Sequence, residues 1–469
     1  MSPAFRLFHF ASYLAFRLGQ GVMRLLSLDC VFRVGRLGGE LAYRILRKRR
    51  AIALGNLRLA FGTEMSEAQL HALNRQHFQF LGANLLAGLK ASTLPQEKIW
   101  ERVTANVPDE RGQSGWIALI SHISNWELYS HLAQKFPEYQ FGALYQPLAN
   151  PFVNRYLKAA RASSGISLFD RRNDLLKCVR FLREGGVVGL LVDQGAGYAG
   201  LWTPLFRRLT SSSTLAARLS LRTGLPILPI AITTCGRARW QMTISEPVYP
   251  NEENAELLTA QINRFLEQQI RRSPADWLWA HNRWKPLRPH FLFARDQRRV
   301  LFPPDFDRST LDPFRILIVS PADAEQAEKT FPAVLAIKQG RPDTWLTVLT
   351  PAALAEVWKD NRAVDCVLEW HREESVFSLA SKIRSAARFD VAIFFATRWK
   401  TSLAIWSAEI PLRVGRRSGA NSWLYNQHPA EPNQPLDSVR MNLHIAQSVG
   451  ANIGTHLGSV EKPISTTAD

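Results

Sequence analysis

From residue 116 onward, short apolar runs alternate with amphipathic segments, and this alternation limits the possible folds more than any other feature of the chain. Runs of six to eight apolar residues are too short for buried helices and predict strands. Strands that are apolar throughout and joined by helices are typical of a mostly parallel sheet with both faces covered. We therefore predict an α/β fold. The best strand candidates in the first half of the chain are residues 116–121, 141–146, 186–193 and 225–232.

The same alternation starts again near residue 314 and predicts a second domain. A chain of 469 residues also exceeds the roughly 250–300 residues that one hydrophobic core usually holds. The pattern favours a Rossmann-like half-domain. A stretch rich in Pro and Arg, residues 286–313, precedes it. We expect one domain at 1–290, a linker at 291–313, a second domain at 314–450 and a tail at 451–469, whose last residues, "SVEKPISTTAD", are expected to be disordered. The second domain's strands are predicted at 315–320, 344–350, 365–370 and 390–396.

The first 90 residues are predicted to be helical, with a new helix capped by Ser66. Near the start, Arg6, Arg17 and Arg24 fall within about 20° of one another on a helical wheel, away from Leu and Phe residues. No charge-free run there reaches the roughly 20 residues that a membrane span needs. The pattern fits a helix lying in a membrane interface. It fits equally a helix packed on its own domain with a solvated basic face.

The net charge of +18 favours anionic partners such as acidic lipids, phosphorylated substrates, acidic proteins or nucleic acid. The basic cluster "RILRKRR" (44–50) lacks the aromatic interleaving of a single-strand binder, so we expect no nucleic-acid partner. The four cysteines lie far apart without a C-x-x-C pair, which predicts neither a zinc site nor disulfides.

The segment "LISHISNWELYSHLAQ" (119–134) places His122 at the exit of a predicted strand and Glu127 five positions later. Ser124 and Glu127 also fit a capping box at the start of a helix, and His122 could be an ordinary loop residue. Alternatively, a histidine oriented by a carboxylate is a working general base. No serine or cysteine is obviously paired with it, so the pair suits direct activation of a substrate hydroxyl.

These residues resemble the H-x4-D/E motif of glycerolipid acyltransferases, and more closely the lipid A biosynthesis (lauroyl/myristoyl) acyltransferase family. Five blocks in the family's order carry the resemblance, which covers roughly residues 1–290. They are "ALGNLRLAF" (53–61), "HISNWE" (122–127), "LYQPLANPFVNRYLKAARASSGI" (144–166), "GVVGLLVDQ" (186–194) and "PADWLWAHNRWK" (274–285).

The resemblance implies a glycerolipid-acyltransferase-like α/β domain with a helical N-terminus. It implies transfer of a fatty acyl chain from acyl carrier protein, or coenzyme A, to a hydroxyl of a lipid A precursor. His122 would deprotonate the hydroxyl and Glu127 would orient His122, with no acyl-enzyme, cofactor or metal. Arg161, and Arg155 second, would neutralise acceptor phosphates or the oxyanion.

Three further positions are candidate substrate contacts. Gln146 stands where the family often has arginine, which puts the acceptor in doubt more than the reaction. Asn150 and Asp193 either hold loops by hydrogen bonds or touch substrate. The tryptophans of the closing block are interpreted as core residues, and His281, Arg283 and Lys285 among them as structural.

Residues 314–430 resemble the N-terminal half of the lipopolysaccharide heptosyltransferase family. Where that family has Gly-Asp after the first strand, this chain has about Glu325-Gln326, and a second, nucleotide-sugar-binding domain does not follow. We therefore expect this glycosyltransferase-type half-domain to lack sugar transfer and to act in docking or stabilisation.

Together, these patterns predict a lipid A-type acyltransferase held to the cytoplasmic face of the inner membrane by its basic amphipathic N-terminus. The alternatives are an acyltransferase for another glycolipid, such as an inositol mannoside, and a non-catalytic lipid-binding scaffold.

Overall fold

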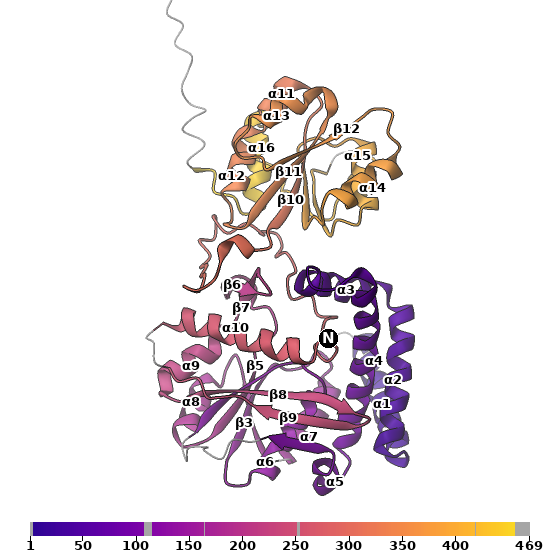
Figure 1. Ribbon diagram of the computed structural model, residues 1–469, viewed down its shortest axis with the longest axis vertical. Helices are drawn as coiled ribbons and strands as arrows, with labels where there is room; N and C mark the ends of the chain where they lie inside the picture. Colours follow the sequence, from indigo (N-terminus) through magenta and orange to yellow (C-terminus); the bar gives the residue numbers. More distant parts are fainter. Residues whose placement is uncertain (1–2, 107–114, 164, 251–253, 418, 455–469) are drawn as a thin grey trace, which may run out of the picture. The chain divides into compact units, whose positions relative to one another are not determined.

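The computed structural model describes residues 3–106, 115–163, 165–250, 254–417 and 419–454 (Figure 1). The chain forms two compact units, one made of the residues up to 284 together with 300–306, and one made of 285–299 and the residues from 307 onward. The stretch predicted as a linker, 291–313, is therefore divided between the units. Phe291 and Leu292 lie in the core of the second unit, whereas Leu301 donates a backbone hydrogen bond to Trp202 of the first.

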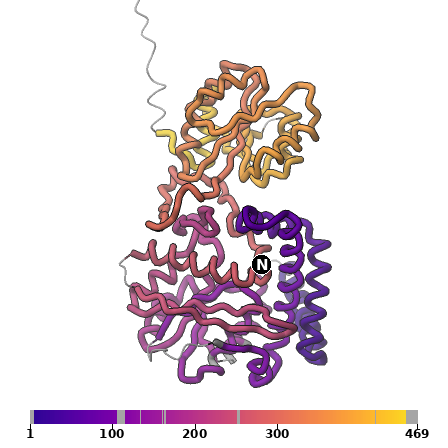
Figure 2. The backbone as a smooth tube through the Cα atoms, viewed as in Figure 1, coloured from indigo at the N-terminus to yellow at the C-terminus, as the bar shows by residue number. Residues whose placement is uncertain are grey.

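Four helices open the first unit, as the sequence predicts: α1 (Pro3–Leu25), α2 (Leu28–Ile45), α3 (Arg47–Phe61) and α4 (Glu67–Ala91). Ser66 forms the predicted cap of α4, in a capping box with Gln69. Helices α1, α2 and α4 lie side by side (Figures 1 and 2). Close approach of α2 and α4 requires glycine, because a Cβ added to Gly35 would lie 2.5 Å from the carbonyl oxygen of Gly82.

Helix α1 turns its polar side toward the protein. Gln20 is buried and accepts a hydrogen bond from the Tyr156 hydroxyl, and the Arg17 guanidinium lies 4.6 Å from the centre of the Tyr156 ring. The predicted basic stripe is nevertheless solvated, because Arg6, Arg17 and Arg24 are all exposed. Large apolar side chains of α1 are exposed as well, among them Leu7, Phe8, Leu14, Leu18 and Leu25. No helix within the described residues is long and apolar enough to cross a membrane.

A seven-stranded sheet forms the core of the first unit, in the order β1-β9-β8-β2-β5-β3-β4. Its strands run parallel to their neighbours except at the antiparallel β8–β9 pair. A separate hairpin is formed by β6 (Leu201–Leu205) and β7 (Arg208–Ser212). The sheet strands are β1 (Val103–Asn106), β2 (Trp116–Ile120), β3 (Phe141–Tyr145), β4 (Ile166–Asp170), β5 (Val187–Leu191), β8 (Ile227–Gly236) and β9 (Arg239–Ile244).

Helices connect these strands and cover the sheet: α5 (Gln96–Trp100), α6 (Leu132–Lys135), α7 (Pro151–Ser163), α8 (Leu175–Arg183), α9 (Leu215–Thr223) and α10 (Ala255–Arg272). The four predicted strands of this unit are all present. The helix expected after His122 is shorter than predicted, a 3-10 turn η1 (Trp126–His131) followed by the four residues of α6.

The second unit has a five-stranded parallel sheet in the order β12-β11-β10-β13-β14, the Rossmann arrangement. The half-domain prediction is confirmed at this level. Its elements are β10 (Phe314–Val319), α11 (Ala324–Glu328), α12 (Phe331–Lys338), β11 (Thr344–Pro351), α13 (Ala355–Lys359), β12 (Cys366–Trp370), α14 (Val376–Ala386), β13 (Val391–Phe394), α15 (Trp399–Ser407), β14 (Leu412–Val414), η5 (Ser422–Leu424) and α16 (Ser438–Ser448). The predicted tail starts too early, because Ala451 is buried in the core of the second unit; from residue 455 onward it lies outside the described residues.

Candidate active site

The candidate site lies at the carboxyl edge of the first sheet, where β2 and β5 end next to each other. His122 follows β2 and Asp193 follows β5, and the two strands are paired in parallel. Nδ1 of His122 lies 2.8 Å from Oδ1 of Asp193, and the backbone N–H of His122 donates to Oδ2 at 2.9 Å. The indole N–H of Trp277 donates to the same Oδ2 at 2.9 Å. Asp193 is thus fixed on both oxygens and holds the imidazole ring in one orientation.

The charges of this pair support each other. Burial lowers the pKa of His122, but the hydrogen bond and the charge of Asp193, with a smaller effect of Glu127, raise it above its usual value overall. Burial raises the pKa of Asp193, whereas its bonds from His122 and Trp277 lower it, and the net effect is a lowered pKa. A carboxylate that accepts from Nδ1–H leaves the lone pair of the neutral ring on Nε2. Nε2 is therefore the atom that can take a proton.

This arrangement corrects the predicted pairing of His122 with Glu127. Glu127 lies on η1, and its carboxylate accepts from the Arg161 guanidinium of α7 at 3.0 and 3.2 Å. Both side chains are about one-third exposed. Within the described residues, the carboxylate that hydrogen bonds the His122 ring is Asp193, and Glu127 acts on His122 through its charge. The structure therefore joins Glu127 to Arg161 in a separate ion pair beside the histidine.

The predicted capping box at Ser124 is also absent from this part of the described chain. Ser124 has a φ of 52°, the left-handed region that side chains other than glycine rarely adopt. Its backbone N–H donates to the carbonyl of Asp276, and its hydroxyl lies 2.8 Å from the hydroxyl of Thr234. The turn reverses the chain directly after His122, and its strained residue is held at both its backbone and its side chain.

Asp276 holds the strained turn at Ser124 in place. Its carboxylate accepts from the backbone N–H and the hydroxyl of Thr234, both at 2.7 Å, and from the Ser273 hydroxyl at 2.7 Å. Since the Thr234 hydroxyl donates to Asp276, the Ser124 hydroxyl must donate to Thr234. Asn84 of α4 also donates to the Thr234 hydroxyl, at 3.0 Å. We call Ser124, Thr234 and Asp276 the turn clamp.

The tryptophan-rich block, 274–285, packs beside His122 and Asp193. Trp277, Trp279 and Trp284 are buried, as interpreted from the sequence. The backbone N–H of Leu278 donates to the carbonyl of His122 at 3.1 Å, so the block runs directly beside the catalytic loop. Asn56 of α3 donates to the carbonyls of Trp279 and His281 at 2.9 and 2.8 Å, which ties the "ALGNLRLAF" block to the tryptophan-rich block. The separated sequence blocks thus meet around His122.

Arg283, interpreted from the sequence as structural, is a buried cation close to this centre, with 3% of its surface exposed. Its guanidinium donates to Thr210 Oγ1, the Ser211 carbonyl and Ser212 Oγ, all neutral acceptors on β7. Burial lowers the pKa of Arg283 to about 10, and the charge of Asp193 opposes that effect. A buried cation beside Asp193 favours the ionised carboxylate that the His122 ring requires.

The other predicted substrate contacts lie farther from the pair. Asn150 donates to the His9 carbonyl of α1 and accepts from the backbone N–H groups of Phe152 and Val153, so both ends of its amide already hold α1 and α7. Gln146 is exposed after β3. Arg155 is exposed on α7, six residues before Arg161 and therefore about 120° around the helix from it. Substrate contacts by these three residues remain predictions.

Helix α4 approaches the site closely at Gly88. A Cβ there would lie 2.7 Å from Asn125 Oδ1 and 3.2 Å from the Cβ of Glu127. Within the described residues, no group of three or more His, Cys, Asp or Glu side chains could hold a metal ion.

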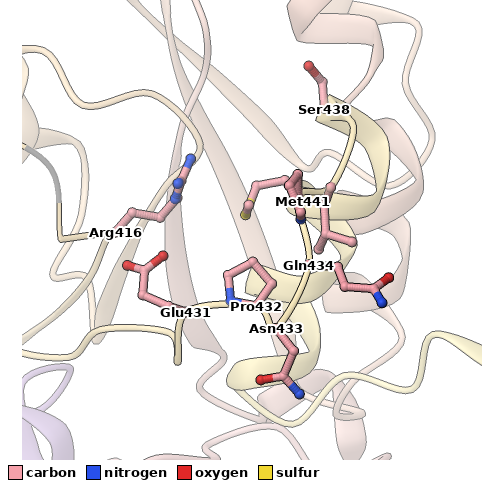
Figure 3. Close-up of a pocket in the computed structure, with 9 residues that line it drawn as sticks. Arg416, Glu431, Pro432, Asn433, Gln434, Ser438 and Met441 are labelled. Carbon is pink, nitrogen blue, oxygen red and sulfur yellow. The ribbon is translucent and has the colours of Figure 1, made fainter.

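In the second unit, an open cavity of about 500 Å³ lies between the loop after β14 and the start of α16 (Figure 3). Arg416, Glu431, Asn433 and Gln434 line it with polar groups. The expected base position, Gln326, lies on the short α11, where its backbone N–H donates to the capping Asp323. Glu325 is paired with Lys329 at 2.6 Å on the same helix.

Comparisons with known proteins concern mainly the first unit. A family model described as bacterial lipid A biosynthesis acyltransferase matches residues 5–286. The lipid A biosynthesis lauroyltransferase of Escherichia coli strain K12 is 28% identical over 292 residues, which cover 59% of this chain and 93% of that protein. The lipid A biosynthesis palmitoleoyltransferase of the same strain is 25% identical over 257 residues, which cover 53% of this chain and 82% of that protein.

Two solved structures are similar over a smaller part of the chain. A family 9 glycosyl transferase from Veillonella parvula is 16% identical with a TM-score of 0.28, over 30% of this chain and 42% of that one. The ADP-heptose lipopolysaccharide heptosyltransferase II of Escherichia coli is 19% identical with a TM-score of 0.24, over 28% of this chain and 40% of that one.

Proposed function

The chain belongs to the bacterial lipid A biosynthesis acyltransferase family and is an acyltransferase, and from this premise we propose its reaction in full. It transfers a fatty acyl chain from acyl carrier protein, or from coenzyme A, to a hydroxyl of a lipid A precursor. The observation that carries the proposal is the His122–Asp193 pair at the carboxyl edge of the sheet. No cofactor takes part, since the thioester donor already supplies an activated acyl group.

His122 is the general base. Nε2 takes the proton of the acceptor hydroxyl as the hydroxyl oxygen attacks the thioester carbonyl. The tetrahedral intermediate then collapses, the carbon–sulfur bond breaks, and the proton on Nε2 passes to the departing thiolate. Asp193 stabilises the imidazolium between the two proton transfers, because its negative charge lies 2.8 Å from Nδ1. The acyl group passes directly between substrates, without a covalent intermediate on the protein.

Arg161 is the candidate cation for the acceptor phosphates or for the oxyanion, and Arg155 is the second. In the structure, Arg161 is neutralised by Glu127. An arriving phosphate can displace this carboxylate, which is one-third exposed, and free Glu127 to act on the histidine, whose pKa it already helps to raise. Glu127 then acts as a positioning residue. Anionic glycolipids other than lipid A precursors fit the same cation, and they form the alternative acceptor class.

The membrane surface supplies the lipid substrate, and the N-terminal helices are the proposed attachment to the cytoplasmic face. Leu18 of α1 and Leu37 of α2 are 72% and 71% exposed, and other large apolar residues on these helices are similarly uncovered. The basic residues of the first 58 positions complement anionic headgroups. The second unit is proposed to have no sugar transfer, because Gln326 is a neutral amide that cannot accept a proton.

The reaction is tested with purified protein, acyl carrier protein charged with a fatty acid, and a bisphosphorylated lipid A precursor. Mass spectrometry should show a product heavier by one acyl group. His122→Ala should lower the rate by roughly 10²–10⁴, the usual contribution of a general base. His71→Ala is the matched control, because His71 is exposed on α4. A His122 variant with full turnover contradicts the mechanism, and absence of any product with the unaltered protein contradicts the acceptor.

A separate incubation with nucleotide-activated heptoses and a lipid A core acceptor should give no sugar transfer. Measurable transfer that is lost in Glu325→Gln would make the protein bifunctional and refute the proposed role of the second unit.

A further inference from the structure

Three tryptophans are exposed together on the second unit. Trp399 and Trp406 lie on α15 and Trp423 on η5, with 52%, 46% and 57% of their surfaces exposed. The Trp423 ring lies between the other two, 6.3 Å from Trp399 and 5.8 Å from Trp406, edge to face with both. Contiguous exposed aromatic surface of this kind marks an interaction site in soluble proteins.

These tryptophans are not badly packed core residues. Residues 399 and 406 are seven positions apart and therefore lie within about 20° of each other on the helix. The buried side of α15 is packed by small or aliphatic side chains: Thr401, Ser402, Ala404 and Ile405. Helix α15 thus has a buried face and, on another side, a stripe of indole rings. The stripe faces away from the core of its own unit.

Positive charge is concentrated on the same segment. Residues 384–417 carry seven Lys or Arg and only two acids, Asp390 and Glu409, whereas acids and bases nearly balance elsewhere in the second unit. Arg398 directly precedes Trp399 at one end of the stripe. At the other end, Arg384 of the neighbouring α14 donates to the carbonyl of Ser407, next to Trp406 (Figure 1). Cations therefore lie at both ends of the exposed rings.

We propose that this tryptophan face, made of Trp399, Trp406, Trp423, Arg384 and Arg398, binds the headgroup region of an anionic phospholipid bilayer. Indole rings are enriched at the membrane–water interface because the ring is apolar while its N–H stays solvated. Arg side chains beside them complement the negative charge of acidic lipids. The face is a membrane contact additional to α1 and α2, and it gives the second unit a role that needs no sugar chemistry.

Hydrogen–deuterium exchange on the full chain tests the proposal without any substitution. Vesicles of phosphatidylcholine with phosphatidylglycerol should slow exchange in peptides that cover 398–407 and 420–425, and vesicles of phosphatidylcholine alone should not. Protection of α1 is a separate signal in the same data, so failure of the N-terminal attachment and failure of this face can be told apart. Absence of protection in the two peptides on anionic vesicles overturns the proposal.

Co-sedimentation with the same vesicles measures how much the tryptophan face contributes to membrane binding. Arg398→Glu should lower the partition coefficient by at least about fivefold, the effect of one basic residue near an anionic surface. The double variant Trp399→Ser/Trp423→Ser should lower it further. Trp345→Ser is the matched control, since Trp345 is a partly exposed tryptophan on β11 outside the face.

Three results refute the bilayer as the occupant. The first is unchanged partition of the face variants. The second is a dimer in sedimentation velocity that dissociates in Trp423→Ser, which would identify a second copy of the chain. The third is equal protection by a soluble heptose, which would identify a sugar.

Discussion

Replacing Asp193 by Asn removes the charge behind His122 while keeping the shape of the side chain. Asp193 is 2% exposed, accepts three hydrogen bonds and lies 2.8 Å from Nδ1 of the ring. An amide presents one oxygen and one NH₂ group, so it can favour the tautomer with the proton on Nε2, which cannot act as a base. The imidazolium also loses its stabilising charge. We expect kcat to fall by about 10²–10⁴, as for other general-base systems, with KM for the acceptor nearly unchanged.

The pH profile separates this mechanism from a structural defect. In the unaltered protein, Asp193 raises the pKa of His122 above 6.5, so the acid limb of kcat/KM should lie above that pH. In Asp193→Asn, burial remains and lowers the pKa, so the acid limb should move to lower pH while the plateau falls. Stability should respond as well. A raised histidine pKa stabilises the fold below the unfolded pKa of 6.5, and this contribution disappears as pH rises through the folded value.

The assay is acyl transfer followed by mass spectrometry from pH 5 to 9, with thermal unfolding measured on the same samples. Asp305→Asn is the matched control, because Asp305 is an exposed aspartate of the same unit. An Asp193→Asn enzyme with an unchanged plateau, or with an acid limb that does not move, would refute the assignment of Asp193 as the orienting carboxylate.

The remaining predictions concern the ion pair, the turn clamp and the N-terminus. Glu127→Ala and Arg161→Ala should each lower kcat/KM at least about tenfold. The double variant should be no slower than the worse single variant, because the effects of removing two partners of one ion pair do not add. Additive losses in the double variant would contradict this coupling. Thr234→Val should lower the free energy of unfolding by about 1–3 kcal/mol, since it leaves buried partners of the turn clamp unpaired, and it should also lower kcat. Thr234→Ser, which keeps the hydroxyl, should restore both stability and kcat. The control is Thr259→Val on α10, which loses a similar buried hydroxyl bond and should leave kcat unchanged. Deleting residues 1–27 should move the protein toward the soluble fraction of a cell lysate, and an unchanged membrane fraction would show that α1 is not the attachment.

Strands with a mainly apolar run could be predicted from the sequence, including the edge strand β12, and strands that mix polar and apolar residues could not. All five residues of β2 and all four of β13 are buried, and both strands appear in the sequence as continuous apolar runs. The edge strand β4 and the antiparallel β9 mix polar and apolar residues, because part of each faces solvent. Their sequences do not differ clearly from loops, and their place in the sheet depends on partners distant in the chain. The hairpin β6–β7 escapes prediction for a different reason: nearly all of its residues are buried, but β7 consists mainly of polar residues.

The sequence predicted the catalytic base, His122, but not the carboxylate that orients it, Asp193. Glu127 is close to His122 in sequence, and a regular helix start after the histidine would have brought the two together. The chain instead reverses at Ser124 in a left-handed conformation, which is held by Thr234 and Asp276 from distant segments.

The position of Asp193 at the end of a strand was the better indication that it is the partner of His122. A side chain that follows β2 and one that follows β5 meet at the carboxyl edge whenever the two strands are neighbours in a parallel sheet, and that edge is where α/β folds place their ligands. Which strands are neighbours is set by tertiary packing and not by sequence distance. Asp193 was identified as a site residue from its motif, but its position 2.8 Å from the His122 ring follows only from the pairing of β2 with β5. In an α/β chain of this kind, carboxylates at other strand ends are therefore better candidates for orienting a strand-end histidine than carboxylates a few residues along the same loop.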